Sequence, residues 1–393
     1  MKVVGIIAEY NPFHRGHAYQ MSLIRKMDPD AAILVVMSGN FVQRGEPAIC
    51  DKMRRARMAL EAGADIVLEL PPAYATSSAP YFAGGAVALL KAAGCVDAVC
   101  FGAPAELEEL QTLADLTENG LPDADIKAAL AEGLTYPAAL SSAAGRIKPE
   151  AAALLTDANN LLAIEYLKAI RAQKAAFKPI CIKRSGAGHG EETLPEQGFA
   201  SAGAIRKALF GGRAKEALLP YLPEKTLLQL DYILSPETVT PALSAVLLRL
   251  SRGGKDAFMP YAEVSEELAA RILAERPYTG SFRELTGLIR SKNITEARVR
   301  RALLHILLDI KKEEQTAEPA ALKILGLRED SFLPGLLKES TRIPIITKAA
   351  DAPEELELPF LFAQDVYRQC VRRAGGPLLP EERRLSPVVV RKT

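Results

Sequence analysis

The first half of the chain alternates between short apolar runs and longer segments in which apolar residues recur at helical spacing. The runs are rich in β-branched residues and bounded by polar or turn residues, which is typical of buried parallel strands. This β-α-β-α order predicts an α/β fold with a doubly wound parallel sheet. The predicted strands are Val3–Ala8, Ala31–Met37, Asp65–Leu70, Ala98–Phe101 and Lys178–Lys183; the predicted helices are Arg15–Met27, Cys50–Ala62, Ala79–Ala93 and Asn159–Ala172.

From about Ala204 the pattern becomes helical, with Leu-rich faces. We therefore expect two domains: residues 1–210, which carry the sheet, and residues 211–393, which are mostly helical. The boundary is expected near Gly211–Gly212, although the Pro-containing stretch Leu218–Pro223 serves nearly as well. Residues Arg342–Thr347 are the segment of this half that we expect to return to the sheet as a short strand. The helices predicted here are Thr240–Arg252, Ser265–Ala274, Ser281–Ile289 and Thr295–Lys312.

The charge of the whole chain favours no particular partner, because 49 Lys and Arg residues face 48 Asp and Glu residues in a total of 393. A nucleic-acid partner would therefore have to meet a local basic patch. Residues 283–312 carry such an excess, with eight Lys or Arg against three Asp or Glu. A charge run of this kind is also typical of a solvated helix face. The residues in it that we single out are Arg290, Lys292, Arg298 and Arg301.

The cysteine pattern and the apolar runs bear on where the protein works. The five cysteines are scattered without a CxxC pair, which predicts reduced thiols in a cytoplasmic protein rather than disulfides or a zinc site. No run reaches the roughly 18 apolar residues of a membrane helix. The first strand is interrupted by Glu9 and Asn11, so it does not form the apolar core of a signal peptide. We expect no membrane association and no obligate protein partner.

The densest chemical signal is EYNPFHRGH at Glu9–His17, where the first strand ends and the first helix begins. At this edge of a doubly wound sheet, ligands bind. His14 and His17 are three residues apart, so both imidazoles project from one side of the helix start, beside free backbone N–H groups, and suit a phosphate. Gly16 leaves room for a ligand near the backbone. The alternatives are that His14 only caps the helix while His17 packs in the core, or that a metal binds. Two histidines alone do not complete a zinc site, so we predict no metal site in the protein.

Several longer strings resemble one family. HRGH matches the HxGH signature of the nucleotidyltransferase superfamily. The whole set resembles the bacterial tRNA(Met) cytidine acetate ligase family over nearly the full chain. The strings are GIIAEYNPFHRGH at residues 5–17, VVMSGNFVQRGEPAICDK at 35–52, GADIVLELP at 63–71, CFGA at 100–103, NNLLAIEYLKA at 159–169, IKRSGAG at 182–188, RRALLHILLDI at 300–310 and RIPIITK at 342–348.

The resemblance implies a Rossmann-like nucleotidyltransferase domain and a reaction in two steps. ATP and acetate would give acetyladenylate and pyrophosphate, with Mg²⁺ assisting, and the acetyl group would pass to N4 of the wobble cytidine of elongator tRNA(Met). It implies that His14 and His17 are catalytic and stabilise charge on the phosphates. The ATP site implied in this way comprises Ile7, Ala8, Glu9, Tyr10, Asn11, Pro12, Phe13, His14, Arg15, Gly16, His17, Gln20, Gly102, Asn159, Asn160, Arg184, Ser185, Ser201 and Arg206.

Some of these residues have expected local roles. Ser201 is expected to cap a helix from which Arg206 turns toward the pyrophosphate. The relatives carry Thr where this chain has Gly203, which removes one hydroxyl from that motif. Of Asn159 and Asn160, one is expected to cap a helix and the other to reach the nucleotide. Gly102 is expected to let the adenosine lie against the backbone.

Polar residues also gather in the loop after the second predicted strand. We expect them to orient the acetyladenylate and the incoming cytosine, with Glu46 or Asp51 accepting a proton; the alternative is a loop that merely fixes itself by hydrogen bonds. The set is Asn40, Gln43, Arg44, Glu46, Asp51 and Lys52.

Two other functions use the same motif. One is a small-molecule adenylyltransferase that acts without RNA. The other is a non-catalytic protein that binds a nucleotide and RNA. The long helical half favours a macromolecular substrate, and the basic residues Arg290, Lys292, Arg298 and Arg301 are then expected to contact the tRNA backbone.

Overall fold

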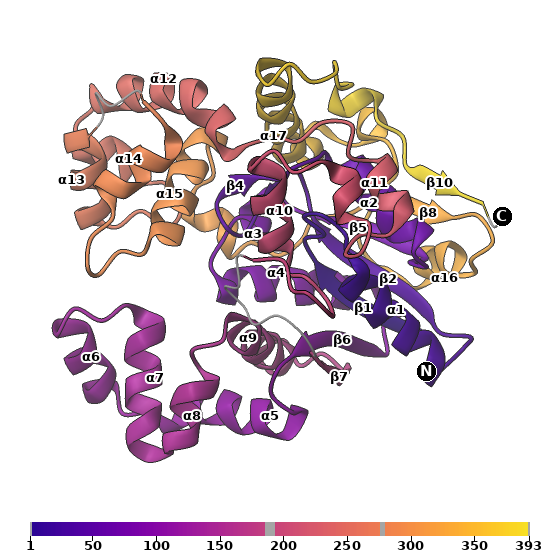
Figure 1. The fold of residues 1–393 in the computed structure, drawn as a ribbon, viewed down its shortest axis with the longest axis horizontal. Helices are drawn as coiled ribbons and strands as arrows, with labels where there is room; N and C mark the ends of the chain where they lie inside the picture. The colour runs from indigo at the N-terminus through magenta and orange to yellow at the C-terminus, as the bar shows by residue number, and fades with distance from the viewer. Residues whose placement is uncertain (1, 185–192, 276–279, 392–393) are drawn as a thin grey trace.

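The computed structural model describes residues 2–184, 193–275 and 280–391, and its centre is one mostly parallel sheet (Figure 1). The strand order is β10-β8-β5-β2-β1-β6-β7, with β9 paired to β8. Within the described residues, neighbouring strands of this sheet pair in parallel, except β5 with β8, which are antiparallel. Its strands are β1 Val3–Ala8, β2 Ala32–Ser38, β5 Ile66–Leu70, β6 Ala98–Ala103, β7 Lys178–Lys183, β8 Leu322–Arg328, β9 Ile345–Ile346 and β10 Val388–Val390; β3 Phe41–Val42 and β4 Glu46–Pro47 form a separate antiparallel pair.

Helices cover both faces of the sheet because successive strand residues point to opposite sides. Val3 and Leu34 pack into the core beneath α4 and α9, whereas Val4 and Val35 pack into the core beneath α1 and α2. The helices of the sheet region are α1 Arg15–Met27, α2 Lys52–Glu61, α3 Pro72–Ala75, α4 Ala79–Ala93, α5 Leu107–Asp115, η1 Leu116–Gly120, α6 Asp123–Ala131, α7 Tyr136–Ile147, α8 Pro149–Leu154, α9 Ala158–Ala172, α10 Ala202–Phe210, η2 Lys215–Leu218 and α11 Glu224–Leu228.

A third core belongs to the helical part of the chain, where residues such as Leu247, Phe258 and Leu303 are fully buried. This part stands to one side of the sheet (Figure 1). Its elements, and those that follow, are η3 Pro236–Val239, α12 Thr240–Ser251, η4 Lys255–Phe258, α13 Glu266–Glu275, α14 Phe282–Ile289, α15 Glu296–Leu308, η5 Lys312–Gln315, α16 Leu333–Ser340, η6 Ala349–Asp351, α17 Glu354–Arg373 and η7 Glu382–Arg384.

The strand order locates the ligand edge. From central β1 the chain first builds β2 and β5 on one side, then crosses to β6 and β7 on the other. In a doubly wound sheet the crevice at such a reversal, here between β1 and β6, is where ligands bind. The loops that follow β1, β2 and β6 meet at this edge, where Arg184 follows the end of β7.

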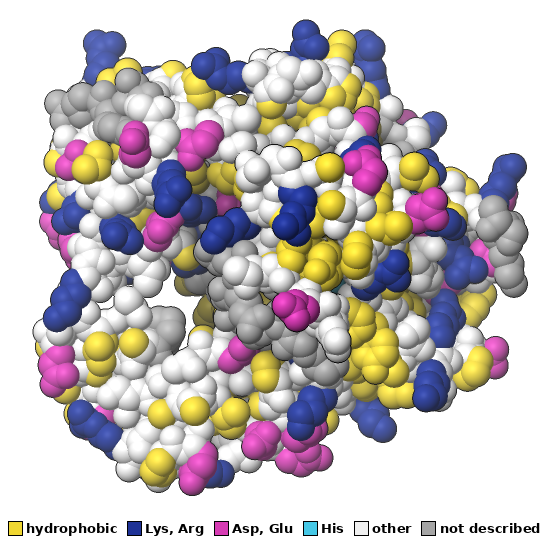
Figure 2. All heavy atoms as spheres, viewed as in Figure 1, with side chains coloured by type: hydrophobic (Ala, Val, Ile, Leu, Met, Phe, Trp, Pro, Cys, Tyr) yellow, Lys and Arg dark blue, Asp and Glu magenta, His cyan; other side chains and the backbone are white. Residues whose placement is uncertain are grey.

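The connection from β6 to β7 carries the group of helices α6–α8, which faces the group α12–α15 on the same side of the molecule (Figure 1). Figure 2 shows an opening between the two groups. Lys292 spans from one to the other, because its Nζ donates to the carbonyl oxygen of Glu132 at 2.8 Å.

The fold class is confirmed, and the nine elements predicted in the first half are present with ends within two residues. The four helices predicted in the second half also form, as α12 to α15. The strand expected within Arg342–Thr347 is β9, but it pairs with a strand that the pattern did not reveal: β8 and β10 add an edge to the sheet. The domain boundary at residue 210 stays a prediction. Strands β8, β9 and β10 come after this boundary in the sequence and belong to the sheet. Within the described part of the chain, no helix has the length and apolar character needed to span a bilayer.

Candidate functional site

The turn between β1 and α1 is capped by the two histidines themselves. The Gly16 N–H donates to His14 Nδ1 at 3.1 Å, and the His14 N–H donates to His17 Nδ1 at 3.2 Å. This is a capping box in which imidazoles replace the usual Ser and Glu. Because each Nδ1 accepts a hydrogen bond from a backbone N–H, the neutral ring must carry its own proton on Nε2. Each imidazole therefore has one donor left for a ligand.

The two rings lie together in a protein environment that opposes positive charge. Their centroids are 3.6 Å apart with 21° between the planes, and Tyr10 and Phe13 pack against the His17 ring. Burial, together with the positive charges of Arg184 and Arg206, lowers the pKa of His14 to about 3. Burial, His14 and Arg184 lower the pKa of His17 well below its usual 6.5. In the absence of an anion both imidazoles are therefore neutral donors. The cap expected of His14 is present, and its ring also lines a pocket; the role of the pair in binding a phosphate stays a prediction.

The pocket at this turn is walled by the ends of β6 and β7, by α1 and by the segment before α10. The set of lining residues is His14, Gly16, His17, Tyr19, Gln20, Gly102, Ile182, Lys183, Arg184 and Phe199. Two predicted glycines have structural reasons that differ from the expected ones. A Cβ on Gly16 would lie 2.9 Å from His14 Cε1, and one on Gly102 would lie 3.2 Å from Arg184 Cγ. Both glycines thus make room for a site side chain, a close approach that a ligand alone does not explain.

Arg206 lies beside the histidine turn, as a residue of α10. Ser201 caps that helix as predicted, its Oγ accepting from the Ala204 N–H at 3.0 Å. Arg206 donates to the Asn11 carbonyl at 2.8 Å, and its Nε lies 3.6 Å from the Glu46 carboxylate. Glu46 also pairs with Arg300 of α15 at 3.1 Å. The predicted phosphate contact is thus buried between the turn and a carboxylate shared with the helical part.

Asn11 holds the turn to the neighbouring loop and leaves one polar group unused. Its Oδ1 accepts from the Ile49 N–H at 2.9 Å, while its buried Nδ2 and the buried hydroxyl of Tyr10 have no hydrogen-bond partner among the described residues. A buried unpaired donor is costly, and a bound ligand or water is the usual reason for it. The other residues of the motif lie close to the histidines along the chain. Ile7 and Ala8 end β1, Pro12 and Phe13 are buried in the turn, and Arg15 donates to the Leu219 carbonyl.

Two expectations for the helix before β7 need correction. Neither Asn159 nor Asn160 caps α9, because Asp157 does so by accepting from both of their N–H groups. Asn160 is buried and ties two loops together: its Oδ1 accepts from Ala105 N–H and its Nδ2 donates to the Leu154 carbonyl. Both polar atoms of the Asn160 side chain are therefore hydrogen-bonded within the fold, whereas the Asn159 side chain is half-buried. Ser185 lies outside the described residues. Gln20 donates to the Cys100 carbonyl from the pocket wall.

The loop after β2 is held by residues far away in the sequence. Asn40 donates to Gln364 of α17 and accepts from the Lys52 N–H. Lys52 is fully buried with its Nζ 2.8 Å from Glu69 and 2.7 Å from Glu382. Burial opposes its charge, but the two carboxylates outweigh burial and raise the pKa of Lys52.

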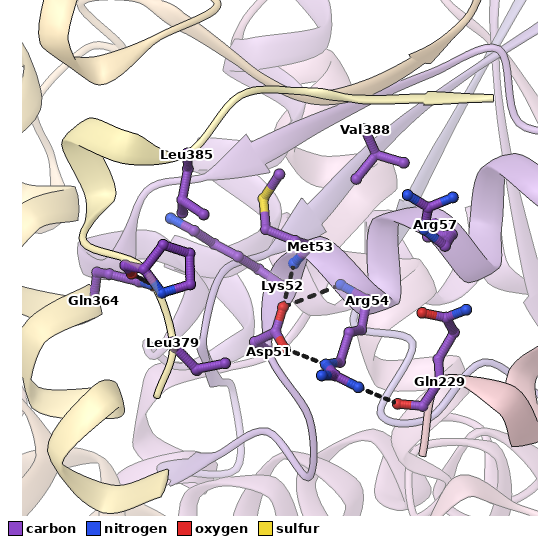
Figure 3. A pocket seen from close by; sticks show the side chains of 11 residues that line it. Asp51, Lys52, Met53, Arg54, Arg57, Gln229, Gln364, Leu379, Leu385 and Val388 are labelled. Atoms are coloured by element: carbon purple, nitrogen blue, oxygen red, sulfur yellow. Dashed lines mark hydrogen bonds and ion pairs between the residues drawn. The ribbon is translucent and has the colours of Figure 1, made fainter. Parts of the chain in front are cut away.

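Asp51 caps α2 and accepts from the Tyr232 hydroxyl at 3.0 Å. Figure 3 shows Asp51 and Lys52 in a second pocket, where the C-terminal segment with Leu379 and Leu385 lies over the start of α2. In that view Lys52 points under this segment, away from Asp51. The Gln43 N–H donates to Glu9, and burial raises the pKa of that carboxyl; Arg44 is exposed.

Sequence reasoning missed Arg55, which organises this edge of the sheet. Its fully buried guanidinium donates to the carbonyls of Cys50, Glu9, Ser38 and Gly39, and so joins the ends of β1 and β2. An Arg in an amphipathic helix gives no local signal for such a role. Tyr19 and Phe199 of the pocket wall were also missed; an aromatic residue on the solvent side of the first helix was the available signal for Tyr19.

The residues predicted to bind tRNA fall into two groups. Arg290 and Lys292 are exposed, and Lys292 reaches the carbonyl oxygen of Glu132 in the other helix group. Arg298 is half-buried, and Arg301 forms a two-contact ion pair with Glu263 at 3.1 Å for each contact. Arg301 is thus occupied by the fold. All five cysteines are free thiols, as expected.

Comparisons with known proteins cover nearly the whole chain. Residues 1–375 match the HIGH Nucleotidyl Transferase family. The tRNA(Met) cytidine acetate ligase of Caldanaerobacter subterraneus is 38% identical over 379 residues, 93% of this chain and 94% of the relative. That of Lysinibacillus sphaericus is 32% identical and covers 99% of this chain and 100% of its own.

Solved structures agree with these sequence relatives. Thermotoga maritima TmcAL bound with alpha-thio ATP has a TM-score of 0.86 at 30% identity, covering both chains completely. The apo form of the same protein has a TM-score of 0.88 at 29% identity, again over both whole chains.

Proposed function

Because this chain belongs to the HIGH nucleotidyl transferase family and, within it, to the tRNA(Met) cytidine acetate ligases, we propose that it activates acetate with ATP and acetylates a tRNA cytidine. The acceptor is N4 of the wobble cytidine of elongator tRNA(Met), and the product is N4-acetylcytidine. The protein is thus an ATP-dependent ligase that modifies tRNA. Its length matches that of the ligases, which argues against a compact adenylyltransferase for small molecules.

One observation carries the site assignment: both imidazoles give Nδ1 to the backbone and keep Nε2–H for a ligand at the β1–β6 crevice. In the first step an acetate oxygen attacks the α-phosphorus, and the bond from that phosphorus to the bridging oxygen breaks. Negative charge then grows on the α-phosphate and on the leaving pyrophosphate. Donors fixed in place before the reaction stabilise this charge without reorganising. His14 and His17 supply two such donors, and their rings are held by the same hydrogen bonds that start α1.

The other members of the nucleotide site follow from position. Gly102 and Arg184 end β6 and β7 on the far side of the crevice from β2, so we assign the adenosine to this wall. The unpaired Nδ2 of Asn11 is a further donor at the turn, and Arg206 adds positive potential beside it. Repulsion between the incoming acetate and the triphosphate is reduced by these groups.

Mg²⁺ is expected to accompany ATP. In the described parts of the chain, no group of three or more His, Cys, Asp or Glu side chains is arranged to hold a metal ion. We therefore assign the ion to the phosphate oxygens of the nucleotide, where it would neutralise charge, and derive no step through it.

In the second step, cytosine N4 attacks the acetyl carbonyl; the N4–C bond forms, the C–O bond to the phosphate breaks, and AMP and one proton leave. Neither Glu46 nor Asp51 is a free base in the structure, since Glu46 lies between two arginines and Asp51 caps a helix. We keep Gln43 and Arg44 as residues that orient the base, and Asn40, Glu46, Asp51 and Lys52 as residues that hold their loop. For tRNA backbone contacts we propose Arg290, Lys292 and Arg298.

The test is to incubate the protein with ¹⁴C-acetate, ATP and tRNA(Met) transcripts whose wobble base is C or U, and to digest the RNA to nucleosides. Label in N4-acetylcytidine, only with the C transcript, is the expected result. Acetate-dependent pyrophosphate release without labelled RNA would favour the small-molecule adenylyltransferase. ATP binding without acetate-dependent turnover would favour the non-catalytic alternative, and either result would overturn the proposal.

A further inference from the structure

Two aromatic side chains stand at the mouth of the histidine pocket. Tyr19 lies on α1 and is 42% exposed, and Phe199 precedes α10. Their ring centroids are 5.2 Å apart with a tilt of 34°. Phe199 also lies directly against the histidine turn, since its Cβ is 3.7 Å from the position of a Cβ on Gly16. We call this pair the aromatic lip; its position relative to His14 and His17 is fixed by the start of α1.

The aromatic lip is not required by the core. The buried residues of α1 are Met21 and Ile24, which face the sheet, whereas Tyr19 points to solvent. Leu219, whose carbonyl oxygen accepts from Arg15, is 45% exposed beside the start of the same helix. Figure 2 shows hydrophobic side chains over α10 and α1 with Lys and Arg around them. A large exposed aromatic surface beside cationic groups is the combination that binds an unpaired nucleotide, whose base stacks while its phosphates pair.

Two bases could occupy the aromatic lip: the adenine of ATP or a base of the RNA. The nucleotide crevice lies between β1 and β6, and its wall is formed by Gly102, Ile182 and Arg184. The lip lines the same pocket from other elements, namely α1 and the segment before α10. The proposed reaction also requires a second base at this mouth, because the cytosine must reach an acetyl group bound next to the imidazoles. Wobble bases are single-stranded and can be splayed onto a protein surface.

We propose that Tyr19 and Phe199 form the stacking platform for an unpaired base of the anticodon loop, so that the aromatic lip is the RNA-base subsite of the enzyme. This inference rests on the proposed function. Stacking on an aromatic ring accepts any base, so the lip supplies affinity and placement, and the choice of cytosine falls to other contacts. The unpaired anticodon base and the adenosine are thus assigned to different elements of one pocket.

The experiment compares Tyr19→Ala and Phe199→Ala with the conservative changes Tyr19→Phe and Phe199→Tyr. Tyr81→Ala is the matched control, because Tyr81 is 40% exposed on α4, outside the pocket. We expect each alanine variant to lower kcat/KM for tRNA by about 10- to 100-fold, as the loss of one stacked base would. The KM for ATP should change by less than about 3-fold, and the conservative variants should retain most of the tRNA reaction.

Binding of an anticodon stem-loop, measured by fluorescence anisotropy, distinguishes a failure of the stacking platform from a failure of the proposed function. Weaker binding by Tyr19→Ala alongside unchanged binding by Tyr81→Ala supports the platform, whether or not the wild type turns over. A larger rise in the KM for ATP than loss in tRNA binding would assign the lip to adenine and overturn the inference. So would wild-type affinity in both alanine variants. Failure of the wild-type protein to form N4-acetylcytidine would instead overturn the proposed function.

Discussion

Two polar segments at the same edge of the sheet look alike in sequence and differ in structure. Among the described residues, the turn at residues 9–17 provides no hydrogen-bond partner for the Nε2–H groups of His14 and His17, since each ring bonds to the backbone through Nδ1. The loop at residues 40–52 places Asn40, Asp51 and Lys52 in hydrogen bonds or ion pairs. Their partners, Gln364, Tyr232 and Glu382, come from distant parts of the chain.

The difference distinguishes side chains that can act on a ligand from side chains that hold the fold in place. A side chain that binds a ligand has a polar atom that faces a pocket and is not hydrogen-bonded within the protein. A side chain that supports the fold has all its polar atoms hydrogen-bonded or ion-paired within the protein. By this criterion the turn acts on the ligand and the loop keeps the turn in place, through Glu9, Asn11 and Arg206. We therefore expect substitutions in the loop to lower the stability of the protein and substitutions in the turn to lower its activity.

The largest effect is expected for Lys52→Met. Removing this ammonium leaves two buried carboxylates, Glu69 and Glu382, that share one remaining ammonium, Lys323, within the described part of the chain. Loss of one partner from a buried ion cluster costs about 3–5 kcal/mol, so we expect a fall of that size in the free energy of unfolding. Urea unfolding followed by circular dichroism measures it. Lys338→Met, at an exposed position, is the control. Unchanged stability together with lost activity would move Lys52 from the supporting loop to the chemistry.

The next effect distinguishes the two functions of His14. Asn can accept the Gly16 N–H as the imidazole does, but it has no counterpart of Nε2. We expect His14→Asn to lower acetate-dependent ATP–pyrophosphate exchange by about 10²- to 10³-fold, with stability retained. His14→Ala should lose the same activity and also about 1 kcal/mol of stability, because the cap is gone. Near-normal exchange in His14→Asn would show that the ring serves only as a cap.

A smaller effect is expected where the two segments meet. Arg300→Met removes one of the two arginines that pair with Glu46 among the described residues, and loss of a hydrogen bond between charged groups costs about 2 kcal/mol. We expect lower stability, partial rescue by Arg300→Lys, and a decrease in the rate of adenylation because Arg206 is less well positioned. Arg283→Met, at an exposed position of α14, serves as the control. A variant with full stability and a rate like that of the control would disconnect the helical part from the turn.

The smallest effect concerns acid stability. His305 is buried, with Nδ1 3.1 Å from the Ala262 carbonyl and Nε2 3.0 Å from the Thr76 hydroxyl, and burial lowers its pKa to about 4. The pKa of His14 is lowered to about 3. Each group protonates in the unfolded chain near pH 6.5 but not yet in the fold, so stability falls as the pH drops from 6.5 toward these values.

The slope contributed by each such histidine is at most about 1.4 kcal/mol per pH unit. Unfolding measured between pH 7.5 and 5.5 should have a shallower slope in His305→Asn than in the wild type. A triphosphate should reduce the slope through His14 and His17, because an anion near a ligand-facing ring favours its protonated form. An equal reduction by the ligand in His14→Asn would contradict the assignment of the turn as the anion site.

The sequence predicted what is local and missed what depends on distant neighbours. Strand β1 and helix α1 were predicted with the observed ends because their pattern and cap lie within 25 residues. Strand β8 was missed because its place beside β5 depends on a partner about 250 residues away, paired antiparallel in an otherwise parallel sheet. For the same reason the loop residues were predicted as ligand contacts: Asn40 is polar and near the edge, and only Gln364 and Lys52 show that it is occupied. For Arg55, nothing in the neighbouring sequence indicates that it joins the ends of two strands.

The central claim is that His14 and His17 present Nε2–H to the triphosphate. Long-range ¹⁵N–¹H correlation spectra of histidine-labelled protein report the tautomer of each ring, and the chain has only four histidines to assign by substitution. At pH 7 we expect both rings as neutral Nε2–H tautomers with unprotonated Nδ1, and a change at both Nε2 signals when a non-hydrolysable ATP analogue binds. Nδ1–H tautomers, or Nε2 signals that do not respond to the analogue, would contradict the account.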